Sequence, residues 1–106
     1  MSELSAEDQK LVTLARATMA RTGAPESAAV RDLDGRTYAA AAIALDSLAL
    51  TALEVCVAMA FSSGARGLEA AVRLGGEGDP DLSAVHELGG DAIVVHLGDA
   101  RGQIGD

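Results

Sequence analysis

The sequence predicts an α/β domain of three layers, in which helices cover both faces of a mixed β-sheet. Three observations lead to this fold class. Segments with helical spacing alternate with short apolar runs, an Asp34-Gly35 pair separates two of these runs, and residues 92–97 form an apolar run that contains His96. An Asp-Gly pair indicates an antiparallel hairpin, whereas a continuous apolar run is typical of a buried parallel strand. The sheet should therefore contain both strand directions.

The first element is a helix predicted over residues 6–21. Ser5 followed by Asp8 resembles a capping box, and apolar residues then recur at helical spacing. Gly23 and Pro25 end the helix.

Two strands should follow, over residues 27–32 and 36–43, joined by a two-residue turn at Asp34-Gly35. The alanine run 39–42 is a poor strand former, so a helix is the rival interpretation there. The preceding hairpin signal favours the strand.

A second helix is predicted from about residue 48 to 62, with Asp46 or Ser47 as its cap and Gly64 after its end. It is apolar nearly all round, and Glu54 is its one charged residue. A helix of this kind is expected to be buried between other elements.

The remaining elements are a strand over 68–74, a helix over 80–88 and a strand over 92–97. Asp79 would cap that helix, with Pro80 in its first turn. The predicted order is α-β-β-α-β-α-β, an antiparallel hairpin leading into two βαβ crossovers.

The composition predicts one domain, residues 1–106, with a core of small side chains. Hydrophobic residues make up 49% of the chain, but aromatic residues only 2%, and alanine supplies about a fifth. Close helix packing or an oligomeric interface would compensate for the missing large side chains. Residues 98–106 are glycine-rich and predicted to be a flexible tail.

The charge argues against several classes of partner. A net charge of −8 disfavours nucleic acid and anionic membranes, and the longest apolar run, residues 38–45, is too short to span a bilayer. Cys56 is the only cysteine, which suits a reducing compartment, and residues 1–10 do not resemble a signal peptide. We expect a cytoplasmic protein.

Four stretches in this order carry a resemblance to a known family. They are Ser27-Ala28-Ala29-Val30 before Asp34-Gly35, Ile43-Ala44-Leu45 with Asp46-Ser47-Leu48, Ala58-Met59-Ala60-Phe61-Ser62-Ser63-Gly64, and the segment from Pro80 to Asp91. Together they resemble the small cytidine deaminases over nearly the whole chain. The resemblance implies the three-layer α-β-α fold of that family and a homotetrameric assembly.

The resemblance also implies a zinc site, for which this chain lacks the residues. The family's Cys-Ala-Glu triplet falls on Thr51-Ala52-Leu53 in one register and on Leu53-Glu54-Val55 in the other, and both registers stay open. Asp81 and Ala84 stand where the family has its two further cysteines. Deamination needs zinc-activated water and a proton-transferring Glu. We therefore expect no zinc, no other cofactor and no catalytic residue.

We expect a vestigial pocket at the place of the family's active site, lined by side chains that do not form the family's zinc site. The candidates are Ile43, Asp46, Thr51, Leu53, Asp81 and Ala84.

Other reactive residue types have simpler interpretations. Cys56 is expected to be a small buried hydrophobe, and His86 alone cannot build a zinc site of three or four ligands. His96 is expected to be a hydrogen-bonded face residue, Asp81 a favourable charge at a helix start, and Glu54 a solvated or paired carboxylate. The loop from Gly75 to Gly78 lacks the phosphate-binding pattern.

The sequence therefore predicts a deaminase-like protein without activity, acting as a self-associating or partner-binding module. We expect a homo-oligomer, a dimer or a tetramer, assembled partly through the helix 48–62; any protein partner is not identified by the sequence. The alternatives are a zinc-dependent cytidine or deoxycytidine deaminase and a nucleoside-binding sensor, each with an unrecognised site.

Overall fold

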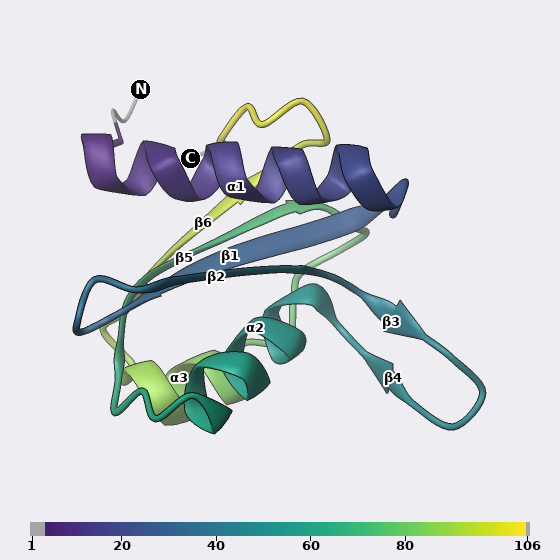
Figure 1. The fold of residues 1–106 in the computed structure, drawn as a ribbon. Helices are drawn as coiled ribbons and strands as arrows, with labels where there is room; N and C mark the ends of the chain where they lie inside the picture. Colours follow the sequence, from purple (N-terminus) through teal and green to yellow (C-terminus); the bar gives the residue numbers. More distant parts are fainter. Residues whose placement is uncertain (1–3, 106) are drawn as a thin grey trace.

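A computed structural model describes residues 4–105 and has three layers. Helix α1 (Ala6–Thr22) covers one face of a four-stranded sheet, while α2 (Ala52–Ser62) and α3 (Ser83–Gly89) cover the other (Figure 1). The sheet order is β2-β1-β5-β6, and its strands are β1 (Glu26–Asp32), β2 (Thr37–Ala41), β5 (Leu68–Gly75) and β6 (Val94–Gly98). The predicted fold class is confirmed.

The sheet is mixed, as predicted. Strand β1 pairs antiparallel with both β2 and β5, and Val30 lies between Tyr38 and Ala71. Strands β5 and β6 run parallel and are joined through α3, so this pair forms a βαβ crossover.

Helix α1 agrees with its prediction to within one residue. The Ser5 hydroxyl accepts a hydrogen bond from the Asp8 amide at 3.1 Å, and Gly23 ends the helix with φ 71°. The Asp8 carboxylate does not complete a capping box, because it instead contacts Arg31 and His96.

The β1–β2 hairpin forms as predicted, but its turn is longer than two residues. The Asp32 amide donates to the Arg36 carbonyl at 2.9 Å, which leaves residues 33–35 in the loop. Among the loop residues only Gly35 has positive φ, at 85°, whereas a two-residue type I′ turn needs positive φ at two positions. The Asp32 carboxylate bonds the amides of Asp34 and Arg36, both at 2.9 Å, and so stabilises the longer loop.

The second helix begins four residues later than predicted, at Ala52. The preceding residues form a small separate hairpin of β3 (Ile43–Ala44) and β4 (Ala49–Leu50), which projects beyond the end of the main sheet (Figure 1). Neither Asp46 nor Ser47 is the cap. Thr51 and Glu54 form a reciprocal capping box, which satisfies two amides and places the start of the helix at this point.

Helix α2 is not covered on all sides, contrary to the prediction. Its buried residues are Ala52, Leu53, Cys56 and Ala60. Ala58 is exposed and Phe61 is 70% exposed. The sheet covers one side of this helix and α3 covers only part of the rest.

Two predictions near the C-terminus need correction. Helix α3 begins at Ser83 rather than Pro80, because the Asp81 carboxylate bonds the Ser83 amide at 2.9 Å and holds the preceding segment in a turn. Strand β6 is parallel to β5, but it is an edge strand and is not buried: Val94 is 51% exposed.

Residues 98–105 turn back toward the sheet. The Asp99 carboxylate accepts from the amides of Arg101 and Gln103, and Ile104 bridges to Gly98 and packs beneath α1. The predicted flexibility of residues 98–106 stays a prediction, and Asp106 lies outside the described residues.

The core consists of two thin layers of small side chains, as the composition predicts. Between α1 and the sheet lie Leu11, Val12, Ala15, Ala29, Ala70, Val72 and Leu74. The opposite layer contains Ala28, Val30, Ala40, Ala52, Leu53, Cys56, Ala60, Ala65, Leu68, Ala71 and Val85. Within residues 4–105, no helix is long and apolar enough to cross a membrane.

Candidate functional site

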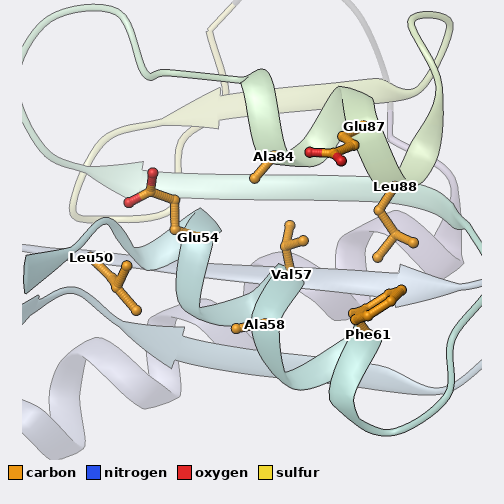
Figure 2. A pocket seen from close by; sticks show the side chains of 8 residues that line it. All are labelled: Leu50, Glu54, Val57, Ala58, Phe61, Ala84, Glu87 and Leu88. Carbon is orange, nitrogen blue, oxygen red and sulfur yellow. The ribbon is translucent and has the colours of Figure 1, made fainter. Parts of the chain in front are cut away.

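An apolar groove runs along the surface between α2 and α3. It has a volume of about 530 Å³ and is lined by Leu50, Glu54, Val57, Ala58, Phe61, Ala84, Glu87 and Leu88. Glu54 lies beside Leu50 at one end, and Glu87 lies on the α3 side between Ala84 and Leu88, whereas Phe61 and Leu88 form the other end (Figure 2). The floor is therefore apolar, with one carboxylate at the Leu50 end and one on the α3 side.

A smaller cavity of about 330 Å³ opens at the N-terminus of α2. Its walls come from β1, the β3–β4 hairpin and the start of α2, and they comprise Glu26, Ala42, Ile43, Ala49, Leu50, Thr51 and Glu54. Leu50 and Glu54 line both this cavity and the groove, so the two hollows are neighbours.

Two carboxylates occupy the N-terminus of α2. Glu54 Oε1 accepts from the Thr51 amide at 2.8 Å, and Glu26 Oε2 accepts from the Ala52 amide at 3.2 Å. The first amides of a helix carry a partial positive charge, so both carboxylates are favourably placed. Three amides there, those of Thr51, Ala52 and Glu54, are already bonded to the protein's own side chains.

The six residues predicted to line a pocket do not gather at one point. Ile43 and Thr51 line the small cavity, and Ala84 lines the neighbouring groove. Leu53 is only 1% exposed and lies in the core between α2 and the sheet.

The two acidic candidates lie on the surface. Asp46 is exposed in the loop between β3 and β4. Asp81 is exposed just before α3, where hydrogen bonds from Ser83 hold the pKa of its carboxyl below the ordinary value. Asp81 therefore acts as a favourable charge at the start of the helix, as predicted.

Sequence reasoning missed several residues that line the two hollows, including Glu26, Leu50 and Phe61. The Thr51-x-x-Glu54 spacing is a capping-box signal that could have placed Glu54 correctly. Glu26 carries no such signal, because it reaches Ala52 across 26 positions of the chain.

Cys56 is buried, as predicted. Its sulfur lies 3.6 Å from the Tyr38 carbonyl, and burial raises the pKa of its thiol to about 12. Because the thiolate is the reactive form, this cysteine is inert at neutral pH.

His96 belongs to a polar cluster on the α1 face of the sheet, away from the groove. Its Nε2 lies 2.9 Å from Asp8 Oδ2, and Arg31 bonds both Asp8 at 2.9 Å and Glu69 at 2.7 Å. Burial raises the pKa of Asp8, but the hydrogen bonds from His96 and Arg31 outweigh it and hold the pKa below its ordinary value. The cluster fastens α1 to β1, β5 and β6, and the expectation of a hydrogen-bonded His96 is confirmed.

Within residues 4–105, no group of three or more His, Cys, Asp or Glu side chains is arranged to hold a metal ion. His86 is half-buried on α3 and belongs to no such group.

Residues 4–102 match a protein-family model described as cytidine deaminase-like. Among solved structures, the chain is similar to the cytidine deaminase from Burkholderia pseudomallei, with a TM-score of 0.74, 19% identity and coverage of 96% of this chain and 91% of that one. It is also similar to a mutant cytidine deaminase from Mycobacterium tuberculosis, with a TM-score of 0.68, 22% identity and coverage of 90% and 85%. For the cytidine deaminase from Mycobacterium leprae the TM-score is 0.64, with 22% identity and coverage of 94% of each chain. No curated protein sequence shows significant similarity to this chain.

Proposed function

Because this chain belongs to the cytidine deaminase-like family, we propose that it is a non-catalytic member of that family, acting as a self-associating or partner-binding module. The observation that carries the proposal is the chemistry of the side chains at the positions where the resemblance would put zinc ligands and a catalytic acid. In one register the first two of these positions hold Thr51 and Leu53, and in the other they hold Leu53 and Val55. Asp81 and Ala84 occupy the remaining two positions in both registers.

This donor set does not fit zinc. Structural and catalytic zinc sites use thiolates, imidazoles and carboxylates, with at least three protein ligands converging on one point. Asp81 is the one such donor among these positions; it is exposed and bonded to Ser83. Ala84 offers no ligand atom, and neither register adds a thiolate or an imidazole.

The residue at the position of the family's general acid or base is not a proton-transferring group in either register. In the first register it falls on Leu53, whose side chain lies in the apolar core. The adjacent Glu54 uses its carboxylate to bond the Thr51 amide at 2.8 Å, so it is held in the capping box of α2. A proton-transferring group must reach the reacting atom within hydrogen-bond distance, and the capping contact holds this carboxylate at the helix end.

The first prediction is that the purified protein holds no stoichiometric zinc. Protein produced without a metal-binding tag, loaded with zinc and dialysed at pH 7, is expected to contain far less than one zinc ion per chain by elemental analysis. Too few ligand atoms converge for tight binding. A ratio near one that survives dialysis would contradict the proposal, and an active cytidine deaminase treated in parallel is the positive control.

The second prediction is that the protein does not deaminate cytidine or deoxycytidine. Without a metal-activated water and a general acid or base, nucleophile and proton transfer are both missing. The absorbance of cytidine is expected to stay constant at high protein concentration, with and without added zinc. Turnover that co-elutes with the protein through purification would instead favour the alternative of an unrecognised deaminase site.

A nucleoside-binding sensor is the second candidate, and the small cavity beside Ile43 and Thr51 is the observation that favours it. Calorimetric titration with cytidine distinguishes it from the module that we propose. Saturable heat without turnover would support the sensor.

Self-association is supported by the uncovered side of α2. Phe61 is 70% exposed, Ala58 is exposed, and both line an apolar groove. Covering a side chain such as Phe61 is worth about 1.5–3 kcal/mol. We therefore propose a dimer or tetramer that covers this surface, in a reducing, cytoplasmic setting that suits a lone buried cysteine.

A further inference from the structure

A buried arginine on β5 has no carboxylate bonded to it. Arg73 is 6% exposed, and its Nη2 donates a hydrogen bond to the Gly78 carbonyl at 2.8 Å. Its Nε is also buried and bonds no group in the described part of the chain. None of the ion pairs found within residues 4–105 involves this guanidinium. A buried charge without a close partner is costly, because it has lost its hydration.

Arg73 lies on the face of the sheet that α2 and α3 cover. Ala71, two residues before it on β5, belongs to the core layer beneath these helices, and alternate residues of a strand share a face. Gly78, which accepts the hydrogen bond, lies in the loop that leads from β5 toward Asp81 and α3. The guanidinium is therefore located at the end of β5 from which the chain continues to α3.

The carboxylate of Glu26 is a neighbour of this guanidinium. Glu26 pairs with Gly75, two positions after Arg73 on β5, so the two charged side chains are diagonal neighbours on one face. A β-carbon added to Gly76 would lie 2.2 Å from Arg73 Nη1 and 3.4 Å from Glu26 Cδ, so both groups border the same glycine. Glu26 Oε2 also accepts from the Ala52 amide at 3.2 Å. The two charges therefore lie side by side near the start of α2.

We propose that Arg73 is the resident cation at the place of the family's zinc site. Its guanidinium supplies, beside Glu26, a positive charge in place of the metal ion, and it excludes divalent cations from this part of the molecule. The inference rests on the non-catalytic function proposed above and names the residue that takes the electrostatic role of the metal.

The contacts of Arg73 connect the two segments to which the resemblance assigns the metal ligands. In one register the first ligand position is Thr51, which adjoins the Ala52 amide bonded by Glu26. The second segment begins at Asp81, three residues after Gly78, the acceptor for Arg73. A divalent cation between these segments would approach a fixed positive charge in a partly buried setting, where charges are poorly screened.

A double-mutant cycle tests whether Glu26 is the countercharge. Glu26→Gln keeps an acceptor oxygen for the Ala52 amide but removes the charge. With Arg73 present, we expect this change to raise the equilibrium constant for unfolding at least about fivefold, as measured by urea denaturation, because the guanidinium loses its countercharge. In an Arg73→Met background the same change should have an effect below about twofold. Arg73→Lys should retain the wild-type response, and Glu77→Gln in the exposed glycine-rich loop is the matched control.

Zinc affinity tests the exclusion of cations. Thr51→Cys, Asp81→Cys and Ala84→Cys together return thiolate ligands at the family's positions in one register. Under reducing conditions, this triple variant should bind zinc at least about tenfold more weakly with Arg73 than with Arg73→Met, because the guanidinium repels the ion. Competition with a zinc-binding indicator measures the ratio. Arg66→Met, at an exposed position before β5, should leave the zinc affinity of the triple variant unchanged.

The outcomes distinguish this inference from the proposed function. Equal zinc affinities with and without Arg73, including no binding in either case, would overturn the role of Arg73, as would an equal effect of Glu26→Gln in both backgrounds. Those results would leave the non-catalytic function standing. Stoichiometric zinc in the wild-type protein would overturn both. If circular dichroism shows that Arg73→Met is unfolded, Arg73→Gln takes its place in both comparisons.

Discussion

Replacing Asp32 with alanine is expected to lower the free energy of unfolding by about 3 kcal/mol, measured by urea denaturation at pH 7. Asp32 is 1% exposed. Its carboxylate accepts from the amides of Asp34 and Arg36, both at 2.9 Å, and from the Tyr38 hydroxyl at 3.0 Å. Alanine leaves these three donors without their acceptor and releases the β1–β2 loop. A loss below about 1 kcal/mol would mean that the loop rebonds to water at little cost.

The pH dependence of the free energy of unfolding distinguishes the contribution of the Asp32 charge from that of its hydrogen bonds. Burial raises the pKa of Asp32, but hydrogen bonds from the Arg36 amide, Tyr38 and the Asp34 amide outweigh it and hold the pKa below its ordinary value. With the folded pKa below the unfolded value of about 3.9, the stabilisation is present above that value and is lost as pH falls through the folded pKa.

Asp32→Asn is the matched control, because it retains one acceptor oxygen without the charge. The stability difference between wild type and Asp32→Asn is expected to be largest at neutral pH and to shrink as the pH falls below about 4. A difference that stays constant from neutral to acidic pH would show that the carboxylate charge contributes nothing.

Introducing a carboxylate at Leu53 is expected to unfold the domain rather than build a catalytic base. Leu53 is 1% exposed and packs in the apolar layer between α2 and the sheet. An unpaired buried charge costs several kcal/mol, so Leu53→Glu should lose at least about 4 kcal/mol. Domains of this size have only about 5–15 kcal/mol of stability in total. Thermal unfolding followed by circular dichroism measures the effect.

Two variants show whether charge or lost packing causes this effect. Leu53→Ala should cost about 2–5 kcal/mol through the cavity it leaves, less than the glutamate. Leu45→Glu, at a site 63% exposed in the β3–β4 loop, should cost almost nothing. A stable Leu53→Glu protein would mean that this side chain can reach solvent at the small cavity, and the proposal of a non-catalytic protein would need to be tested again with that variant.

Local signals in the sequence were sufficient to predict most of the secondary structure and the direction of the strands. The Ser5 cap and Gly23 bounded α1 because both act through neighbouring backbone groups. The Asp34-Gly35 pair predicted the β1–β2 hairpin, and the apolar run at 92–97 predicted a strand parallel to its neighbour. The burial of Cys56 and the hydrogen bonding of His96 also followed from their local surroundings.

Where the sequence left two choices, contacts distant in the chain decided between them. Helix α2 begins at Ala52, where its capping box and the Glu26 carboxylate from β1 meet, and residues 43–50 are left to form a hairpin. Of the pocket candidates, Thr51 lines the small cavity but Leu53 lies in the core, because side chains two positions apart on a helix point in different directions.

The sequence by itself determined the three-layer fold and the side chains available at the candidate site, since both depend on residue type and periodicity. Tertiary structure alone decided which faces stay uncovered. The apolar pattern of α2 predicts burial on all sides, but α3 is only seven residues long and leaves Phe61 exposed above the groove. The length and position of a packing partner are properties of the assembled chain, so the periodicity of one helix cannot report them.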